Sequence, residues 1–388
     1  MNERELLFAL LRSEVCAERL ELNIGEELTS ELMGKLLALA TSHDLAHIIG
    51  QALKKLGYLG DDPISQMMDR RVKEAVYRYL RLDIAYGQIV SLLEKAKIPF
   101  IPLKGTVLRK DYPEPWMRTS CDIDVLVKEE QLDEAVEVLS KALSCRCGPK
   151  GDHDIVLYTA GGVLIELHYD TIQERYAVNE CRDVLGRIWE DAQPDAPGSC
   201  AYHMSDEMFY FYHMAHMTKH FGNGGCGVRS FLDVWILNHA VAHDRNRREA
   251  LLLEGGLLVF AQAAEKLSEV WFSGVQPDSL TEAMGDYILR AGVYGNNENR
   301  AAVGQARMGG RMKYLLLRRV FMPYDFLKAE YPVLKKHKWL TPVYQVVRWV
   351  RMLTGGHLKQ TLRELRANAG SRETKIRSVA ELLNELGL

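Results

Sequence analysis

Asp122 and Asp124 stand at the start of an apolar run that continues to Val127, with one apolar residue between them. Alternate side chains of a β-strand point to the same face, so a strand here places both carboxylates on one face and turns Ile123 and Val125 toward a core. Two neighbouring carboxylates repel each other unless a cation lies between them. Magnesium binds oxygen ligands and typically uses one or two carboxylates together with substrate phosphates. The pattern predicts a metal and phosphate site; the alternative is two solvated acids at a strand end.

A second apolar run, from Ile98 to Leu103, ends directly before Lys104, Gly105 and Thr106. Glycine after a strand allows backbone N–H groups to approach a phosphate, and the start of a helix adds a favourable dipole. Lys104 contributes a cation and Thr106 contributes a hydroxyl group. We expect these residues to bind the β- and γ-phosphates of a nucleotide.

The segment from Val163 to Asp170 alternates apolar and polar residues, which places Glu166 and His168 on one face of a strand. Glu166 lies between apolar neighbours and is the predicted third carboxylate, with Asp154 as the alternative. His168 is expected to face the same side of the sheet as these carboxylates. There it would contact a phosphate or the molecule that accepts the transferred group.

The proline-bounded segment from Asp111 to Ser120 leads into the Asp122 strand and must cross the mouth of the site. Arg118 lies in this segment. Its guanidinium group suits either a phosphate or a carboxylate partner, and the sequence leaves both open.

These motifs resemble the uncharacterised nucleotidyltransferase family of the polymerase-β-like nucleotidyltransferase superfamily over residues 85–240. The resemblance is carried by Leu103-Lys104-Gly105, Tyr112, Pro115, Arg118, Asp122-Ile123-Asp124 and Glu166-Leu167-His168. The superfamily pattern is a Gly-Gly or Gly-Ser turn, an acid-x-acid strand and a later single acid; here the turn is Gly105-Thr106. The resemblance implies an NTP substrate and two Mg²⁺ or Mn²⁺ ions held by the catalytic residues Asp122, Asp124 and Glu166.

A histidine-rich segment from Phe209 to His220 places His213, His216 and His220 on one face of a helix. Three ligands spread over nearly two helical turns span about 10 Å, which is too far for one zinc ion. We expect this face to line the cleft opposite the strands instead.

The resemblance extends to the residues that follow this helix. A histidine-rich helix, a glycine turn and an Arg-x-x-x-Asp helix look like companions of the catalytic strands in the family. The resemblance implies that the nucleotide contacts Lys219, His220, Arg229 and N–H groups of the glycine loop at residues 221–227. It adds His213, His216 and Asp233 as further cleft residues.

The composition is that of a globular protein with 388 residues and a hydrophobic fraction of 47%. Seven cysteines without a Cys-x-x-Cys pair argue against a disulfide framework or a zinc ribbon and favour a reducing compartment. The N-terminus lacks the pattern of a signal peptide, and no apolar run approaches the roughly 20 residues needed to span a bilayer. We therefore expect a cytoplasmic protein without a membrane partner.

The hydrophobic periodicity predicts an α+β fold, in which a small sheet core is embedded between N-terminal helices and a larger C-terminal helical region. The resemblance implies that this core is of the polymerase-β-like nucleotidyltransferase type. Helices are expected at residues 3–21, 27–58, 64–97 and 129–143, a strand at 98–103, and a hairpin from strands at 153–158 and 163–169. The predicted regions are N-terminal helices (1–84), the nucleotidyltransferase core (85–192), a helical domain that closes the cleft (193–300) and a basic helical extension (301–388). His43, Asp44 and His47 lie near a helix boundary and are expected to pack or to cap.

The net charge of −3 hides an asymmetry, because residues 305–388 carry 17 Lys and Arg against 6 Asp and Glu, or +11. Within them, Val343–Leu365 reads as a basic amphipathic helix. Such a region either is a solvated helical face docked on an acidic body or attracts an anionic partner. The second interpretation gives an alternative function, non-catalytic nucleotide or RNA binding by these helices. A third function is a toxin-like enzyme that modifies tRNA or a protein. The sequence does not identify the acceptor, which is a small molecule, an RNA or a protein. It also does not identify the NTP or the oligomeric state.

Overall fold

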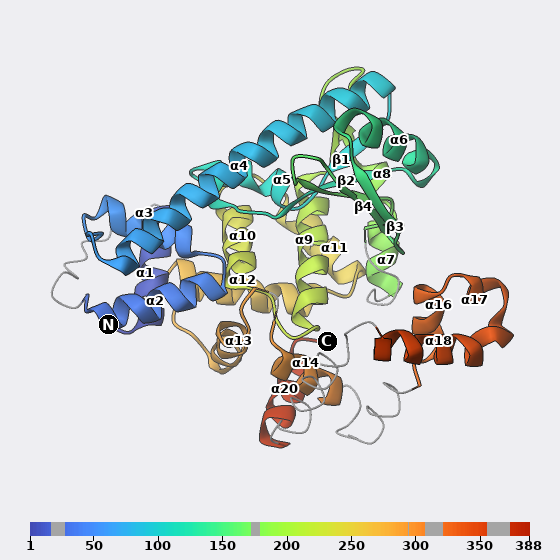
Figure 1. Cartoon of the computed structure of the whole chain (residues 1–388). Helices are drawn as coiled ribbons and strands as arrows, with labels where there is room; N and C mark the ends of the chain where they lie inside the picture. Colours follow the sequence, from blue (N-terminus) through green and yellow to red (C-terminus); the bar gives the residue numbers. More distant parts are fainter. Residues whose placement is uncertain (17–27, 172–178, 294, 307–320, 355–372) are drawn as a thin grey trace.

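The computed structural model describes residues 1–16, 28–171, 179–293, 295–306, 321–354 and 373–388 (Figure 1). Within these ranges, helices surround one mixed sheet of five strands. The predicted α+β class is confirmed.

Three helices begin the chain: α1 (Glu3–Val15), α2 (Ser30–Ser42) and α3 (Ala46–Lys55). The prediction of one continuous helix at 27–58 is wrong, because the chain turns between α2 and α3, where Asp44 has a φ of 54°. Aspartate adopts this left-handed conformation more readily than most residues because its short side chain can form local hydrogen bonds. The helix predicted at 3–21 is described only as far as α1, and its remainder lies outside the described residues.

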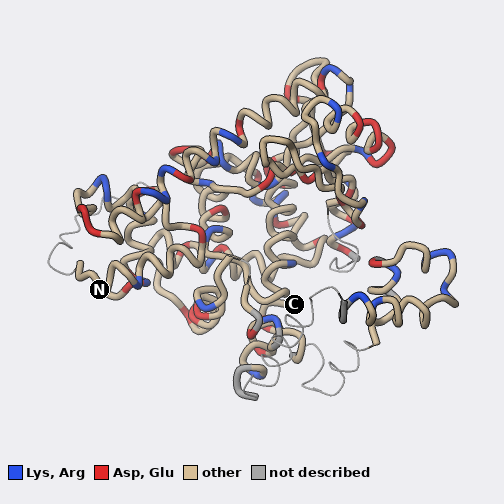
Figure 2. The backbone as a smooth tube through the Cα atoms, viewed as in Figure 1, with Lys and Arg blue, Asp and Glu red and all other residues tan. Residues whose placement is uncertain are grey.

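The helix α4 (Pro63–Ala96) connects the N-terminal helices to the sheet. Asp62 caps it by accepting hydrogen bonds from the N–H groups of Ile64 and Ser65, and Pro63 occupies the first turn. α4 packs against α3 at one end and against α6 (Leu132–Leu143) at the other, and both signs of charge occur along it (Figures 1 and 2). The helix predicted at 64–97 is confirmed, and the predicted boundary between residues 84 and 85 falls inside it.

The sheet has the order β1-β2-β5-β4-β3. Its strands are β1 (Phe100–Pro102), β2 (Asp122–Val127), β3 (Arg146–Lys150), β4 (Asp154–Tyr158) and β5 (Leu164–His168). The central pair, β2 and β5, is parallel, and the other neighbours are antiparallel. The predicted hairpin is confirmed as β4 and β5. The sequence did not indicate β3, because this edge strand is mostly exposed and lacks the apolar alternation of a half-buried strand.

Short elements and a second group of helices complete the fold. Before β3 come α5 (Gly105–Leu108) and the 3₁₀ turns Arg109–Asp111, Pro115–Met117 and Glu129–Gln131. After β5 come α7 (Asn179–Leu185), α8 (Ile188–Asp191), β6 (Gln193–Pro194), β7 (Tyr202–His203), α9 (Asp206–Phe221), α10 (Val228–His239), α11 (Arg245–Glu254), α12 (Leu258–Phe272), α13 (Ser279–Leu289) and α14 (Asn297–Ala306). The last described elements are α16 (Tyr324–Glu330), α17 (Val333–Lys336), a 3₁₀ turn at Lys338–Leu340, α18 (Thr341–Thr354) and α20 (Glu373–Glu385).

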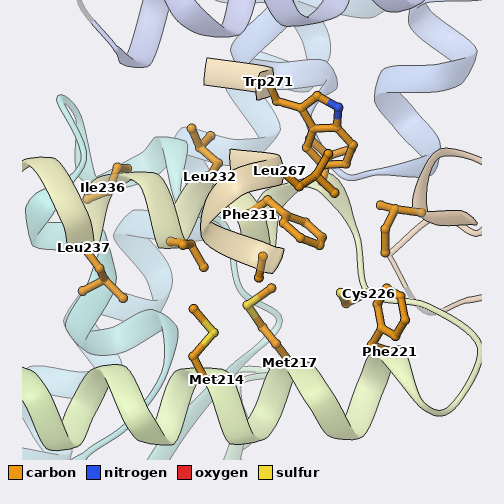
Figure 3. Close-up of a cluster of buried hydrophobic side chains, with 14 of the residues drawn as sticks. Met214, Met217, Phe221, Cys226, Phe231, Leu232, Ile236, Leu237, Leu267 and Trp271 are labelled. Atoms are coloured by element: carbon orange, nitrogen blue, oxygen red, sulfur yellow. The ribbon is translucent and has the colours of Figure 1, made fainter. Parts of the chain in front are cut away.

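Two hydrophobic cores support these elements. The smaller one joins the C-terminal half of α4 and α6 to one face of the sheet through residues such as Ile123, Val125 and Ile165. The larger one joins α1, α2 and α3 to α9, α10, α12 and α13. Figure 3 shows its centre, where Met217 of α9 and Phe231 of α10 lie near Trp271 of α12. The N-terminal helices and the later helices therefore share one core, although half the chain separates them.

The C-terminal elements α16, α17 and α18 lie together to one side of the helical core (Figure 1). Residues 321–354 carry six Lys and Arg against two Asp and Glu, a net charge of +4, visible as mostly blue charged positions in Figure 2. The basic amphipathic helix predicted at Val343–Leu365 is described only within α18, and its second half lies outside the described residues. None of the helices in the described ranges has the length and hydrophobicity needed to cross a bilayer.

Candidate active site

A cavity of about 390 Å³ lies between the sheet and the helices α9 and α10. Most of the predicted site residues line it: Lys104, Gly105, Arg118, Asp122, Asp124, Glu166, His213, His216, Lys219, His220 and Arg229. A second cavity of about 480 Å³, lined by residues of α10, α11 and α12, contains none of them. The predicted residues therefore gather in one place from four separate parts of the chain.

The carboxylates of Asp124 and Glu166 are brought together by the register of the sheet. β2 and β5 are parallel neighbours, and Asp124 is paired directly with Glu166. Asp122 precedes Asp124 by two residues, and it lines the same cavity. Asp154, the alternative third acid, also lines the cavity but lies one strand further away, on β4 opposite His168. The strand pairing thus favours Glu166 as the partner of Asp124.

Lys104 is the cation that lies beside the carboxylates of Asp124 and Glu166. Its Nζ atom lies 2.7 Å from Oδ1 of Asp124 and 3.7 Å from Oε2 of Glu166. Burial alone would lower the pKa of Lys104, but the two carboxylates outweigh this effect and raise it. Burial would likewise raise the pKa of Asp124, and Lys104 and His168 together hold it below its ordinary value. Asp124 is therefore an ionised carboxylate whose Oδ1 atom contacts both Lys104 and His168.

His168 lies behind the carboxylates and does not line the cavity, which corrects the prediction that it faces the acceptor. Its Nε2 atom is 2.9 Å from Oδ1 of Asp124 and 3.5 Å from Oε2 of Glu166. Burial would lower the pKa of His168, but the hydrogen bonds to these acids raise it. The side chain of His168, at the end of β5, is buried, and its Nε2 atom contacts both acids, so the imidazole positions the two carboxylates.

Asp122 differs from Asp124 in its electrostatic surroundings. Burial first, and then repulsion from Asp124 and Glu166, raise the pKa of Asp122 to about 6. Among the described residues no Lys, Arg or His forms an ion pair with its carboxylate. A bound cation would relieve this repulsion.

Two carboxylates and one imidazole nitrogen form a group that could hold a divalent ion. One ligand atom from each of Asp124, Glu166 and His168 lies within 4.8 Å of the others, and this is the one such three-residue group in the described part of the chain. The predicted ligand set was Asp122, Asp124 and Glu166, and Asp122 lies outside the group. Carboxylate oxygens suit Mg²⁺ or Mn²⁺ better than softer metals. The residues present thus fit such an ion.

The opposite wall of the cavity is formed by histidines of α9. The Nε2 atoms of His216 and His220 lie 3.2 Å apart, and His213 contacts the carbonyl oxygen of Ser230 at 3.3 Å. Burial, followed by neighbouring cations that include Lys104, holds the pKa of His216 well below its ordinary value. Burial also lowers the pKa of His220 to about 4. At neutral pH this wall therefore offers neutral imidazoles in a positive environment, which suits an anion better than a second cation.

Arg118 reaches the cavity from the loop before β2 and pairs with an acid on α10. Its Nε atom donates a 2.7 Å hydrogen bond to Oδ1 of Asp233, which also accepts one from the hydroxyl of Tyr112 at 2.7 Å. Asp233 is completely buried and does not line the cavity. The prediction that Asp233 faces the cleft is therefore corrected: it holds Arg118 from behind.

Asp44 is a cavity residue for which the sequence indicated only packing or capping. Its Oδ2 atom accepts hydrogen bonds from Nη1 of Arg229 at 2.6 Å and from the hydroxyl of Thr119 at 2.7 Å. Both Asp44 and Arg229 line the cavity. The available signal was the helix boundary at His43 and Asp44, but it carries no information about a partner so distant in the sequence.

Two expectations about phosphate-binding groups are not met by the geometry. Thr106 does not line the cavity, and its buried hydroxyl has no hydrogen-bond partner among the described residues. The glycine loop is used for packing: a Cβ atom on Gly225, which has a φ of 130°, would lie 2.6 Å from Cβ of Ala291. The N–H group of Gly225 donates to the carbonyl of His220. Gly225 and Gly227 permit close contact with the segment after α13, and the N–H groups of Gly222, Gly224 and Gly225 donate to carbonyl groups at the end of α9.

Among the comparisons with known proteins, one family model matches the part of the chain that forms this cavity. No curated protein matches the chain significantly. No solved structure matches it significantly either. A family model described as an uncharacterised nucleotidyltransferase matches residues 29–273, which extend from just before α2 to just after α12 and include every cavity residue named above. The chain belongs to this family of uncharacterised nucleotidyltransferases.

Proposed function

We propose that the protein is a metal-dependent nucleotidyltransferase that transfers a nucleoside monophosphate from an NTP to an acceptor hydroxyl. The observation that supports this most directly is the pairing of Asp124 with Glu166 in the parallel strands β2 and β5, with Asp122 lining the same cavity. Three carboxylates that line one cavity repel one another, and a bound divalent cation would relieve this repulsion. The family membership supports the same class of reaction.

Asp122, Asp124 and Glu166 are the residues that would hold Mg²⁺ or Mn²⁺. When bound, two such ions would stabilise negative charge on the attacking and leaving oxygens of the α-phosphate. The chain's own contribution is to hold the carboxylates in place through Lys104 and His168, which contact both Asp124 and Glu166.

The remaining cavity residues are proposed to bind and orient the NTP. Lys104, Arg118, Lys219 and Arg229 supply positive charge from opposite sides of the cavity, and Gly105 allows the backbone to approach the phosphates. The acceptor oxygen forms a bond to the α-phosphorus while the bond to the β-phosphate oxygen breaks, and pyrophosphate leaves with that electron pair. Glu166 is more exposed than Asp124, with 24% of its side chain accessible against 4%, and is proposed to accept the hydroxyl proton.

The acceptor class is proposed only broadly, as a small molecule, an RNA or a protein, and the location as the cytoplasm. The alternative of non-catalytic nucleotide or RNA binding is favoured by one observation, the net charge of +4 on residues 321–354. Under that alternative, binding would weaken with salt and would survive loss of the carboxylates.

Pyrophosphate release from each NTP in the presence of Mg²⁺, with cell extract as the source of acceptor, tests the proposal. Asp124→Asn should abolish release and transfer of an α-phosphate label, and circular dichroism should show that the variant still folds. Asp154→Asn is the matched control, since this acid lines the cavity without contacting Glu166. Label transfer by Asp124→Asn at the wild-type rate would exclude the proposed mechanism.

A further inference from the structure

The ammonium group of Lys104 lies at the point where two of the proposed metal ligands face each other. It is 2.7 Å from Oδ1 of Asp124 and 3.7 Å from Oε2 of Glu166. These are the same two oxygens that Nε2 of His168 approaches from behind, at 2.9 and 3.5 Å. A divalent ion on these oxygens would lie within a few ångströms of the ammonium group, and like charges at that distance repel strongly. The ion and Lys104 in its present position therefore compete for one place.

The backbone at Lys104 is held in a conformation that directs the side chain to this place. Lys104 has φ 47° and ψ −125°, a region that residues with a side chain rarely adopt. The N–H of Leu103 donates to the carbonyl of Asp124, and the carbonyl of Lys104 accepts from Val107 and Leu108, so both sides of the turn are fixed. Glycine would relieve the strain at this position but would bring no charge. The strained lysine points to a role for its ammonium group.

The side chain of Lys104 borders open space in the cavity. Lys104 lines the cavity, and 23% of its side chain is exposed. A triphosphate in the cavity would offer the ammonium group new negative partners and would at the same time provide additional oxygen ligands for the metal ion.

We propose that Lys104 acts as an exchangeable counter-ion, which neutralises Asp124 and Glu166 in the free protein and moves to the triphosphate when NTP binds. A divalent ion then binds tightly only together with the nucleotide. This inference rests on the proposed function, because it assumes that the three acids hold the ion. It differs from a fixed phosphate-binding role, since it makes the affinity for metal depend on the nucleotide.

The affinity of the full-length protein for Mn²⁺, measured by electron paramagnetic resonance, tests the inference. Mn²⁺ is titrated with and without an ATP analogue that has a methylene group between its α- and β-phosphates. The wild type should bind Mn²⁺ weakly alone, and Lys104→Met should bind it about tenfold or more tightly without nucleotide, the size of a typical coupling between sites. Lys35→Met removes an exposed cation that is paired with Glu31 and does not line the cavity, and it should change this affinity by less than about threefold.

The outcomes separate this inference from the proposed function. If the wild type binds Mn²⁺ with the analogue, and Lys104→Met without it binds no more tightly than the wild type, the exchange is excluded and the metal site stands. If no form of the protein binds Mn²⁺ under any condition, the proposed function itself fails. Should Lys104→Met not fold, Lys104→Gln removes the charge while keeping a hydrogen-bond donor, and the same comparison decides.

Discussion

Asp44 and Arg229, which are 185 residues apart in the sequence, form a 2.6 Å ion pair at the edge of the cavity. Thr119, in the loop before β2, is bonded to both side chains. Burial would raise the pKa of Asp44, but Arg229 and Thr119 hold it below its ordinary value. The N-terminal helices thus hold a cation of the proposed nucleotide site, in agreement with a family match that begins before α2.

Asp44→Asn should impair nucleotide binding, because Arg229 loses its charged partner and can leave the cavity. A charge-assisted hydrogen bond contributes about 1.5–3 kcal/mol, so we expect the KM for NTP to rise by roughly tenfold or more with a smaller change in kcat. Steady-state pyrophosphate release measures both constants. In a double-mutant cycle with Arg229→Met, the two effects should not add; additive effects would show that Asp44 acts independently of Arg229.

Asp233→Asn should destabilise the protein, since Arg118 would remain buried without its counter-charge. Breaking a buried ion pair by removing one partner typically costs about 3–5 kcal/mol. Urea denaturation followed by circular dichroism gives the free energy of unfolding. Glu31→Gln, which disrupts the exposed pair with Lys35, is the control and should leave the free energy of unfolding almost unchanged. Equal losses in the two variants would contradict the structural role of Asp233.

The stability of the protein should fall as the pH is lowered from about 6.5 to about 4. Burial lowers the pKa of both His43 and His47 from 6.5 to about 4, so both are neutral in the fold. The unfolded chain takes up protons at higher pH than the folded chain, and the stabilisation present above pH 6.5 is lost as the pH falls through the folded values. Each pKa unit corresponds to about 1.4 kcal/mol for each histidine.

Urea denaturation at pH 7, 6 and 5 measures this loss, and His47→Gln provides the comparison. The side chain of His47 bonds the carbonyl of Met117 at 2.8 Å, so the variant is expected to be less stable at every pH. Its free energy of unfolding should nevertheless decline less steeply below pH 6.5. Parallel curves for the two proteins would mean that His47 does not contribute to the pH dependence.

Gly225→Ala should destabilise the fold without a specific effect on the KM for NTP, because the loop packs against Ala291 and does not hold phosphates. The added Cβ atom would meet that side chain at 2.6 Å, and overpacking of this kind costs about 1–3 kcal/mol. Gly198→Ala is the matched control, since Gly198 also has a positive φ, of 83°, but nothing lies within 4 Å of the added atom. A large increase in KM with unchanged stability would restore the phosphate-binding interpretation of the loop.

The sequence by itself determined the local elements and the chemistry that they carry. Period-two alternation identified the strand of Asp122 and Asp124 and the strand of Glu166, and helical periodicity identified the helix at 64–97. These signals are local, because caps, turns and alternating burial act between residues close together in the chain. They were sufficient for the α+β class and for the family.

The tertiary structure decided which of these residues meet. The pairing of β2 with β5 in a register that opposes Asp124 to Glu166 depends on packing against α4 and α6. The same holds for Asp44 beside Arg229, for the burial of Asp233 and His168, and for the close packing of Gly225. Which residues become neighbours across a fold depends on how all the apolar surfaces of the chain are buried together. The spacing of residues within one segment does not determine that arrangement.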